Sequence, residues 1–511
     1  IIYYLLIEMK YGSVAAGHKS TAKAAMDILK DGGNAFDAAV TAVFVSMTSE
    51  YCLTGACGGG IMLAHPNNSS PIIFDFFIHT PKNYKSRKLD FFPVEINFGT
   101  SRQTFYIGKA SIGVPGNVAG LLHIHSRLGS IPLKRIIAPA IHIAKYGTKI
   151  NKAQEYLFNI LDPILTYSND GEKLFKTKER IMKNGDTFKN QDFANFLEEL
   201  AIEGSNYIYK GVVSSSIIKL MKDGGLITRG DLLDYQVIER KPLVTKFYDK
   251  KIITNPPPSQ GGSLISFILN LLSSQFKKNE INQRQLIIAM HLGQIIRKDL
   301  NAKKIDINNL FNKQFYDKYF DMYLKKIEKN IYNDKSGSGS TTHVSVIDSN
   351  NNSASITTSN GAGSGYIIPN TGIMMNNMLG EEDLNPEGFH SWNTSIRMQT
   401  MMSPTIISGN SGPELILGSG GSNRIGSAIK QVIINKYING MDLTSSIYSP
   451  RIHLDGNIIH CEKGVDCKDL DFTWSKINQW DDKNLFFGGV NAVTKNEAVG
   501  DIRRGGCGLI S

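Results

Sequence analysis

The chain is poor in the features that mark disulfide-bonded, metal-bound and membrane-spanning proteins. Its 511 residues include five cysteines, an odd number, and none are spaced as CxxC, so neither a disulfide framework nor a structural zinc site is expected. The longest apolar run, residues 264–272, contains Ser266 and Asn270 and is far shorter than the roughly 20 residues of a spanning helix. Residues 1–7 are apolar but lack a basic flank and a cleavage motif. We therefore expect a cytoplasmic protein without a membrane span.

A clustered positive charge, the usual mark of nucleic-acid binding, is also missing. The net charge is +10, from 56 Lys and Arg against 46 Asp and Glu, but the basic residues are spread along the chain. The densest stretch, residues 297–329, mixes both signs at helical spacing, which is typical of a solvated helix face. We expect neither a nucleic-acid nor a membrane partner.

What is present is the composition of a large folded protein, with 41% apolar residues, 48 glycines and no internal repeat. Helical periodicity over residues 20–47, broken at Gly32-Gly33-Asn34, predicts two helices. Two short apolar runs, residues 61–64 and 72–76, predict a hairpin at a buried sheet edge. Residues 111–250 have mostly helical patterns, with strand-like alternation over residues 243–253 and a further helix after residue 262.

The Gly/Ser run at residues 335–340 is the main division of the chain. After it, residues 344–348 and 353–359 flank an Asn-rich turn and predict a second hairpin. Further strands are expected at residues 373–375, 405–407 and 415–417, followed by one clear helix at residues 424–435. The part after residue 340 is therefore expected to be rich in strands.

Three motifs partly match cofactor-binding or metal-binding patterns, but each lacks a residue or a geometry that the pattern requires. Residues 12–20 almost match a phosphate loop, yet His18 interrupts the motif; residues 418–423 begin like a dinucleotide loop, yet Asn423 stands where a third glycine is needed. His123 and His125 fall on an expected helix, where residues two apart point in different directions and cannot share a metal. We expect no cofactor and no metal.

A serine hydrolase is one alternative that the sequence leaves open. Ser20-Thr-Ala-Lys23 matches the S-x-x-K pattern of penicillin-binding enzymes, but no Lys-Thr-Gly strand supports it. A capped helix start explains the same residues.

The segment that begins at Ser340 carries the most specific chemistry. A threonine hydroxyl becomes a nucleophile when the chain is cut just before it, because the freed α-amine then accepts the hydroxyl proton. Thr341 follows a Gly/Ser run and opens a strand, as this chemistry requires. Gly420-Gly421 after a strand and before a helix would offer backbone N–H groups to an oxyanion. Both features indicate acyl transfer.

Eight motifs in a fixed order extend this interpretation to nearly the whole chain. With them the sequence resembles the γ-glutamyltransferase (γ-glutamyltranspeptidase) family of N-terminal nucleophile hydrolases. The motifs lie at residues 27–39, 58–63, 113–120, 256–262, 341–348, 372–377, 402–405 and 418–425.

The resemblance implies an α+β fold, a four-layer αββα sandwich, cut autocatalytically between Ser340 and Thr341. Residues 1–340 would form a mostly helical large subunit and residues 341–511 a strand-rich small subunit, sharing one intertwined core; association into a higher oligomer is left open.

The resemblance also assigns roles to individual residues. The catalytic ones are Thr341 as nucleophile, Ser359 beside it, and Gly420, Gly421 and Ser422 at the oxyanion; those for the donor substrate are Asn360, Asn377, Glu381, Glu382, Thr400 and Met401.

This chain departs from the family where the donor carboxylate binds. Phe77 stands where the transpeptidases that act on glutathione carry an arginine, and it cannot make the charge-assisted contact. Thr400 and Met401 replace a pair of serines, so one hydroxyl is lost. Arg397 is a candidate for the missing cation.

We therefore expect a self-processing amidohydrolase that forms an acyl-enzyme on Thr341 and passes a γ-glutamyl group to water or an amine, with hydrolysis favoured. An acylase for glutaryl or cephalosporin-type amides is the alternative with the same nucleophile. A non-catalytic binding homologue that stays uncleaved is the alternative of another class.

Overall fold

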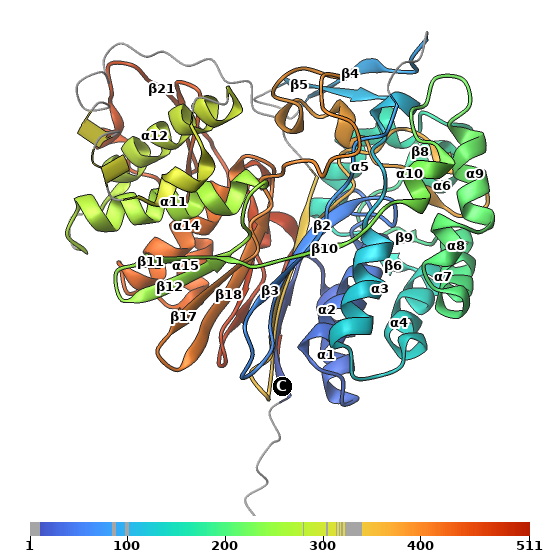
Figure 1. Cartoon of the computed structure of the whole chain (residues 1–511), viewed down its shortest axis with the longest axis horizontal. Helices are drawn as coiled ribbons and strands as arrows, with labels where there is room; N and C mark the ends of the chain where they lie inside the picture. Colours follow the sequence, from blue (N-terminus) through green and yellow to red (C-terminus); the bar gives the residue numbers. More distant parts are fainter. Residues whose placement is uncertain are drawn as a thin grey trace, which may run out of the picture.

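The computed structural model describes residues 11–83, 88–97, 102–278, 281–302, 305–312, 314–315, 317, 320–321 and 340–511. The apolar residues 1–7 and the Gly/Ser residues 335–339 lie outside this part. Two large sheets form its centre, and helices cover the outer face of each (Figure 1).

The first sheet is antiparallel and has seven strands. In spatial order they are β10 (Ile238–Arg240), β3 (Ile72–Phe76), β2 (Gly59–His65), β14 (Ser353–Ser359), β13 (Thr342–Asp348), β1 (Gly12–Ala16) and β24 (Cys507–Ile510). The hairpin predicted for residues 344–359 is present as β13 and β14. The edge position predicted for residues 61–76 is wrong, because β2 pairs with β14 and β10 covers β3.

The second sheet has six antiparallel strands. They are β11 (Leu243–Phe247), β12 (Lys250–Thr254), β17 (Thr405–Gly409), β18 (Gly412–Gly420), β22 (Gly489–Val493) and β23 (Ala498–Val499). In both sheets, strands from before residue 340 pair with strands from after it: β2 pairs with β14, and β12 with β17. The two parts of the chain therefore build one core.

The helices α1 to α10 of the described chain lie on the side of the first sheet, at the right of Figure 1. They are α1 (Lys19–Lys30), α2 (Ala35–Ser49), α3 (Asn117–Leu128), α4 (Leu133–Tyr146), α5 (Lys152–Leu165), α6 (Asn169–Phe175), α7 (Gln191–Glu203), α8 (Asn206–Tyr209), α9 (Val212–Leu220) and α10 (Arg229–Leu233). The break predicted between α1 and α2 is present: Gly32 has φ +89°, and Asn34 caps α2 in a capping box with Asp37.

Within the described residues, the helices on the side of the second sheet are α11 (Gln260–Gln275), α12 (Gln283–Asn301), α14 (Arg424–Tyr437) and α15 (Leu443–Tyr448). Short strands complete the described fold. They pair as β4 (Phe92–Asn97) with β5 (Arg102–Ile107), β6 (Thr148–Lys149) with β9 (Thr187–Phe188), β7 (Lys176–Thr177) with β8 (Arg180–Ile181), β15 (Ile367–Ile368) with β16 (Ile373–Met374), and β19 (Ile452–Asp455) with β20 (Ile458–Cys461) and β21 (Lys476–Gln479). The 3-10 turns are η1 (Lys109–Ser111), η3 (Ile307–Phe311), η4 (Met378–Gly380), η5 (Glu382–Leu384), η6 (Lys468–Leu470), η7 (Leu485–Phe487) and η8 (Ile502–Arg504).

Three apolar layers hold these elements together, because side chains alternate across each strand. In the first sheet, Val346 packs against α2, while Ile347 faces the other sheet. In the second sheet, Ile416 faces the first sheet, while Leu417 packs against α11 and α14. Among the described helices none has the length and apolarity to cross a bilayer.

Candidate active site

The residue predicted as nucleophile lies at the start of a central strand. Thr341 directly precedes β13, which pairs with β14 on one side and β1 on the other. Thr341 is 4% exposed and Ser340 is 5% exposed. The peptide bond between them is thus buried, whereas proteases cut exposed, mobile segments.

The hydroxyl of Ser359 contacts this bond directly. Its Oγ donates to the carbonyl oxygen of Ser340 and accepts from the backbone N–H of Gly361 at 3.0 Å. Both contacts fix the direction of the hydroxyl proton. A donor on a carbonyl oxygen stabilises the negative charge that develops there when the carbon is attacked.

The glycine loop after β18 lies against the other side of Thr341. A Cβ on Gly420 would come within 2.0 Å of the Thr341 carbonyl oxygen, so only glycine fits. Gly421 has φ +119° and Ser422 has φ +51°, and within the described chain the N–H groups of these two residues have no recorded acceptor. They precede α14, whose N-terminal dipole favours negative charge. This geometry suits the predicted oxyanion site.

His343, two residues along the strand, is not available as a base. Its Nδ1 shares a hydrogen bond with Thr357 Oγ1 at 2.8 Å and its Nε2 one with Ser345 Oγ at 2.9 Å. Burial lowers the pKa of this imidazole to about 3, so it is neutral. The ring packs against Gly418 between the two sheets.

Two of the predicted donor-binding residues, Asn377 and Glu381, meet at the loop that follows Ser359. Asn377 Oδ1 accepts from the N–H of Gly363 at 3.2 Å, and Glu381 Oε1 accepts from the N–H of Ala362 at 3.2 Å. Burial and the neighbouring charge of Asp383 raise the pKa of Glu381 to about 8. At neutral pH this carboxyl holds a proton.

The other acidic and amide residues lie differently. Glu382 is exposed. Asn360 is buried, its Nδ2 donates to Met374 O at 3.2 Å, and its Oδ1 has no partner in the described structure. Ser422 Oγ donates to Asp383, which ties the oxyanion loop to the segment that carries Glu381.

The predicted replacement cation is already engaged. Arg397 donates to the carbonyl oxygen of Phe77, to Tyr235 Oη at 2.6 Å and to Gln236 O at 2.6 Å, and its Nε pairs with Asp75 at 3.3 Å. Arg397 lines a cavity of about 250 Å³. To bind a substrate carboxylate it would have to give up some of these contacts. Its predicted role as a substrate ligand stays a prediction.

Phe77 itself is 1% exposed and packs in the layer between the sheets. Its backbone lies near Ser359, since Gly59 pairs with Ser359 and a Cβ on Gly59 would meet the Phe77 backbone at 2.9 Å. Thr400 and Met401 lie at the start of α11, where the Thr400 carbonyl accepts from Ser259 Oγ at 2.7 Å.

Sequence reasoning missed two charged residues beside Thr341. Arg504 donates from Nη1 to the Thr341 carbonyl oxygen at 3.4 Å and from Nη2 to Leu485 O at 3.1 Å. Glu50, at the end of α2, accepts from the hydroxyls of Thr342 and Thr21. Burial raises the pKa of Glu50 to about 7, although both hydroxyls oppose the shift. No local motif marks either residue.

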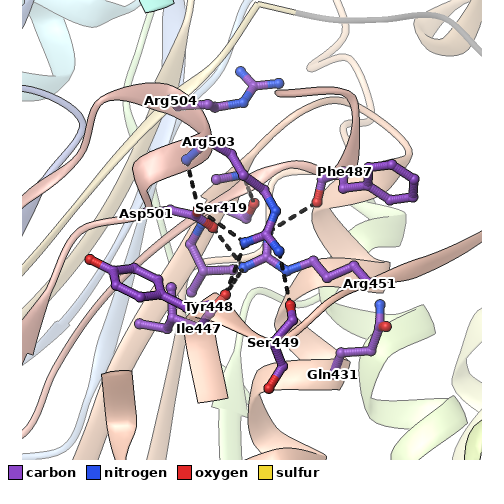
Figure 2. A network of polar contacts seen from close by, with 12 residues as sticks. Ser419, Gln431, Ile447, Tyr448, Ser449, Arg451, Phe487, Asp501, Arg503 and Arg504 are labelled. Atoms are coloured by element: carbon purple, nitrogen blue, oxygen red, sulfur yellow. Dashed lines mark hydrogen bonds and ion pairs between the residues drawn. The ribbon is translucent and has the colours of Figure 1, made fainter. Parts of the chain in front are cut away.

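A buried ion network holds Arg504 in place (Figure 2). Arg451 pairs with Asp501 at 2.6 Å, and Arg503 pairs with Asp501 at 3.2 Å and with Glu462 at 2.5 Å. Asp501 also accepts from the N–H of Val490 in β22 at 3.0 Å. The turn of residues 501–504 is therefore fixed to the second sheet.

The residues of the rejected motifs have structural roles. Lys23 is exposed and pairs with Asp27 at 2.6 Å, while Ser20 bonds Thr148 Oγ1 at 3.1 Å, so the two do not form a nucleophile–base pair. His123 pairs with Glu239, and His125 bonds Ile131 O. The described residues hold no group of three or more His, Cys, Asp or Glu suited to a metal.

Comparison with solved structures defines the fold. Cephalosporin acylase from Bacillus halodurans matches with a TM-score of 0.84 at 20% identity, covering 98% of this chain and 96% of that one. The fold is therefore the mixed α/β fold of that acylase.

Sequence comparison defines the family. The model "Gamma-glutamyltranspeptidase" matches residues 21–509, and the chain belongs to this family of enzymes. The glutathione hydrolase proenzyme of Pseudomonas aeruginosa is 30% identical over 479 residues, covering 86% of this chain and 82% of that protein. The proenzyme of acylase ACY 1 from a Pseudomonas species is 28% identical over 475 residues, covering 89% and 84%.

The buried Glu50 carboxyl makes stability depend on pH. Its pKa is about 7 in the folded chain against about 4.3 in an unfolded one, so between these values the folded state binds the extra proton. The free energy of unfolding should then fall as pH rises from about 4.5 to 7, by up to about 1.4 kcal/mol per pH unit. Glu50→Gln, which keeps an acceptor for both hydroxyls, should remove this component.

The measurement is urea unfolding at several pH values in a Thr341→Ala background, which lacks the hydroxyl of the predicted nucleophile. Glu198→Gln, at a half-exposed carboxylate of α7, is the control and should leave the slope unchanged. If the free energy of unfolding of Glu50→Gln changed with pH in the same way as that of the Thr341→Ala chain, Glu50 would not be the source of the pH dependence.

Proposed function

We propose that this chain is a self-cleaving amidohydrolase in which Thr341 carries the acyl group of a γ-glutamyl donor of the glutathione type. The observation that carries the proposal is the buried Ser340–Thr341 peptide bond, with the Ser359 hydroxyl donating to its carbonyl oxygen. An external protease has no access to such a bond, whereas the Thr341 hydroxyl belongs to the residue that supplies the nitrogen of the bond.

Maturation would begin with attack of Thr341 Oγ1 on the carbonyl carbon of Ser340. The C–N bond breaks as the C–O bond forms, and the acyl group moves from the nitrogen to the oxygen of Thr341. Water then hydrolyses the ester, which leaves Ser340 as a new C-terminus and Thr341 with a free α-amine. Ser359 stabilises the oxyanion in the first step.

In the mature enzyme the α-amine would act as the base. An α-amine has a pKa near 7.7–8.0, far below that of a lysine, so much of it is neutral near neutral pH. The Arg504 guanidinium beside the Thr341 carbonyl disfavours a second positive charge there and thus favours the neutral amine. The amine takes the hydroxyl proton during attack on the substrate amide and returns it to the leaving amine.

The N–H groups of Gly421 and Ser422 are proposed to bind the substrate oxyanion. Both follow Gly420, which lies against the Thr341 carbonyl, and both are without an acceptor in the described structure. The acyl-enzyme then passes its acyl group to water, which we propose as the main acceptor, or to an amine.

The finer description of the fold belongs to the same proposal. One apolar layer lies between the two sheets, and one lies between each sheet and its helices. These three layers support the αββα sandwich of N-terminal nucleophile hydrolases. Residues 1–340 would be the large subunit and residues 341–511 the small one. Both sheets contain strands from each of these two parts.

A second donor class is favoured by one observation. Phe77 is apolar and buried, and Arg397 is held by Asp75 and three oxygen acceptors, so a free cation for a donor α-carboxylate is missing at these two positions. A glutaryl donor lacks the α-ammonium group, so its distal carboxylate is not held to the orientation of an α-amino acid end and can bind away from positions 77 and 397. The names of two of the similar proteins, the acylase ACY 1 and the cephalosporin acylase, support this alternative.

Replacement of the nucleophile tests the proposal most directly. Purified wild type should convert from 56.4 kDa into two fragments, the smaller beginning Thr341-Thr342-His343, and Thr341→Ala should stay whole. Intact mass and N-terminal sequencing give the answer.

A wild-type chain that stays whole after long incubation would instead favour a non-catalytic binding homologue. Ser20→Ala should cleave and react normally; its inactivity would support the serine hydrolase.

The hydroxyl of Ser359 is expected to control the rate of cleavage. Ser359→Ala removes the donor on the Ser340 carbonyl, and loss of one such donor slows related reactions by about 10²–10³-fold. Ser359→Thr keeps the hydroxyl and is the matched control. The fraction of uncleaved chain is followed with time on denaturing gels. Equal rates for the alanine and threonine variants would show that the contact has no part in cleavage.

A donor comparison separates the two substrate classes. We expect the cleaved enzyme to release glutamate from glutathione, with more free acid than dipeptide product when glycylglycine is present. Dominant transfer to glycylglycine would contradict the preference for water. If glutaryl amides react at least about tenfold faster than γ-glutamyl amides in kcat/KM, the acylase alternative replaces the γ-glutamyl proposal.

A further inference from the structure

The helical layer on the second sheet contains a cavity that no catalytic residue lines. It lies among α11, α12 and α14, has a volume of about 70 Å³, and is also lined by β19 and Met401. Each helix contributes four lining residues from one face, spaced at positions i, i+3, i+4 and i+7. These residues are Gly261, Leu264, Ile265 and Ile268 from α11; Met290, Gly293, Gln294 and Arg297 from α12; and Asn423, Gly426, Ser427 and Lys430 from the start of α14.

Glycines make the space. Gly261, Gly293 and Gly426 lie on all three helices at the cavity wall. A Cβ on Gly426 would be 3.6 Å from Lys430 Nζ and 3.6 Å from Ile265, which is ordinary contact distance. The volume is about that of two water molecules, so the cavity can hold water or a ligand of about four non-hydrogen atoms.

Lys430 is the unusual residue of this wall. Its side chain is 5% exposed, and the described residues give its ammonium no hydrogen bond and no ion pair. A buried charge without a partner is costly, and burial lowers the pKa of this lysine to about 7. Lysines are rarely buried in this way unless something compensates the charge.

Other polar atoms of the wall also lack partners. Arg297 Nε and His453 Nε2 are buried without hydrogen bonds, although Arg297 Nη1 donates to Asn423 Oδ1 and His453 Nδ1 bonds Ser427 Oγ. Gln294 donates to Leu454 O and leaves its Oε1 unpaired. The wall therefore offers several N–H donors and one acceptor, Gln294 Oε1. A second proton of the Lys430 ammonium can donate to this acceptor.

The local charge balance is positive. Asp455 is the carboxylate on the wall, and its charge, like that of Asp383, stabilises the neighbouring Arg424 guanidinium. The positive charges of Lys430 and Arg297 at the cavity wall are then not balanced by this carboxylate. Lys430 and Arg424 both act against protonation of His453, whose pKa lies well below its usual range.

We propose that this cavity is a binding site for a small carboxylate of formate or acetate size, with Lys430 as its charged ligand. The ligand oxygens would accept from Lys430 Nζ and from Arg297 Nε–H, and an aliphatic end would lie against Ile265 and Ile268. The site is independent of the proposed acyl-enzyme chemistry. It borders the predicted site, since Asn423 follows Ser422 and Met401 is itself a predicted donor-binding residue.

Thermal unfolding of the whole chain in the Thr341→Ala background tests the site without any need for activity. At pH 6, where a lysine with this pKa carries its proton, sodium acetate at about 100 mM should raise the midpoint by about 2 °C or more over sodium chloride of equal ionic strength. Sodium formate should act alike, and sodium benzoate, which is too large, should not.

Two variants locate the effect. Lys430→Met removes the charge at similar length, and Gly426→Ala puts a methyl group into the cavity while favouring the helix. Both should lose the acetate shift, whereas Lys436→Met, on the same helix but paired with Glu497, should keep it. Gly426→Ala keeps the test valid if Lys430→Met fails to fold. An equal shift in all variants, or no difference between acetate and chloride, would overturn the proposal.

Discussion

The central position of β13 is the constraint on which the rest of the site depends. This strand is hydrogen-bonded along both edges, to β14 and to β1, and the second sheet packs across its face. Thr341, at its start, therefore cannot shift without breaking the sheet. Every group that meets Thr341 is attached to the same core: Ser359 ends β14, Gly420 ends β18, and Arg504 follows the turn that the buried ion network fixes to β22. The chemistry depends on a rigid meeting point of strand ends.

Local signals in the sequence were enough for the local structure. The Gly-Gly-Asn break, the hairpin around the Asn-rich turn and the helix after the glycine loop all have their causes within a few residues, and all are present. Strand β1 and the sheet order were missed, because five small residues, Gly12–Ala16, have no strong periodicity, and their strand forms only between partners more than 300 residues away. The edge assignment for β2 failed for the same reason, since β14 comes from the far end of the chain.

The candidate site shows the same division. Thr341 and the glycines of residues 420–421 could be predicted because each lies in a short motif with a chemical reason. Glu50 and Arg504 were not, because their roles come only from where α2 and the C-terminal turn end in space. Arg397 shows the reverse case: its charge and position in the sequence suggested a substrate ligand, but the buried Asp75 beside it and the carbonyl of Phe77 take up its donors. A motif predicts which group is present, and only the packing decides whether that group is free.

Each large sheet contains strands from both sides of residue 340, and this has a consequence for the lifetime of the protein. Before a cut, refolding is a unimolecular search within one chain. After a cut, the same sheets belong to two chains, and neither can complete a sheet alone. Unfolding the cut form would then release two incomplete partners whose reassembly depends on concentration and competes with aggregation. Durability of the cut form would be set by the rate of its first opening and not by an equilibrium between folded and unfolded states.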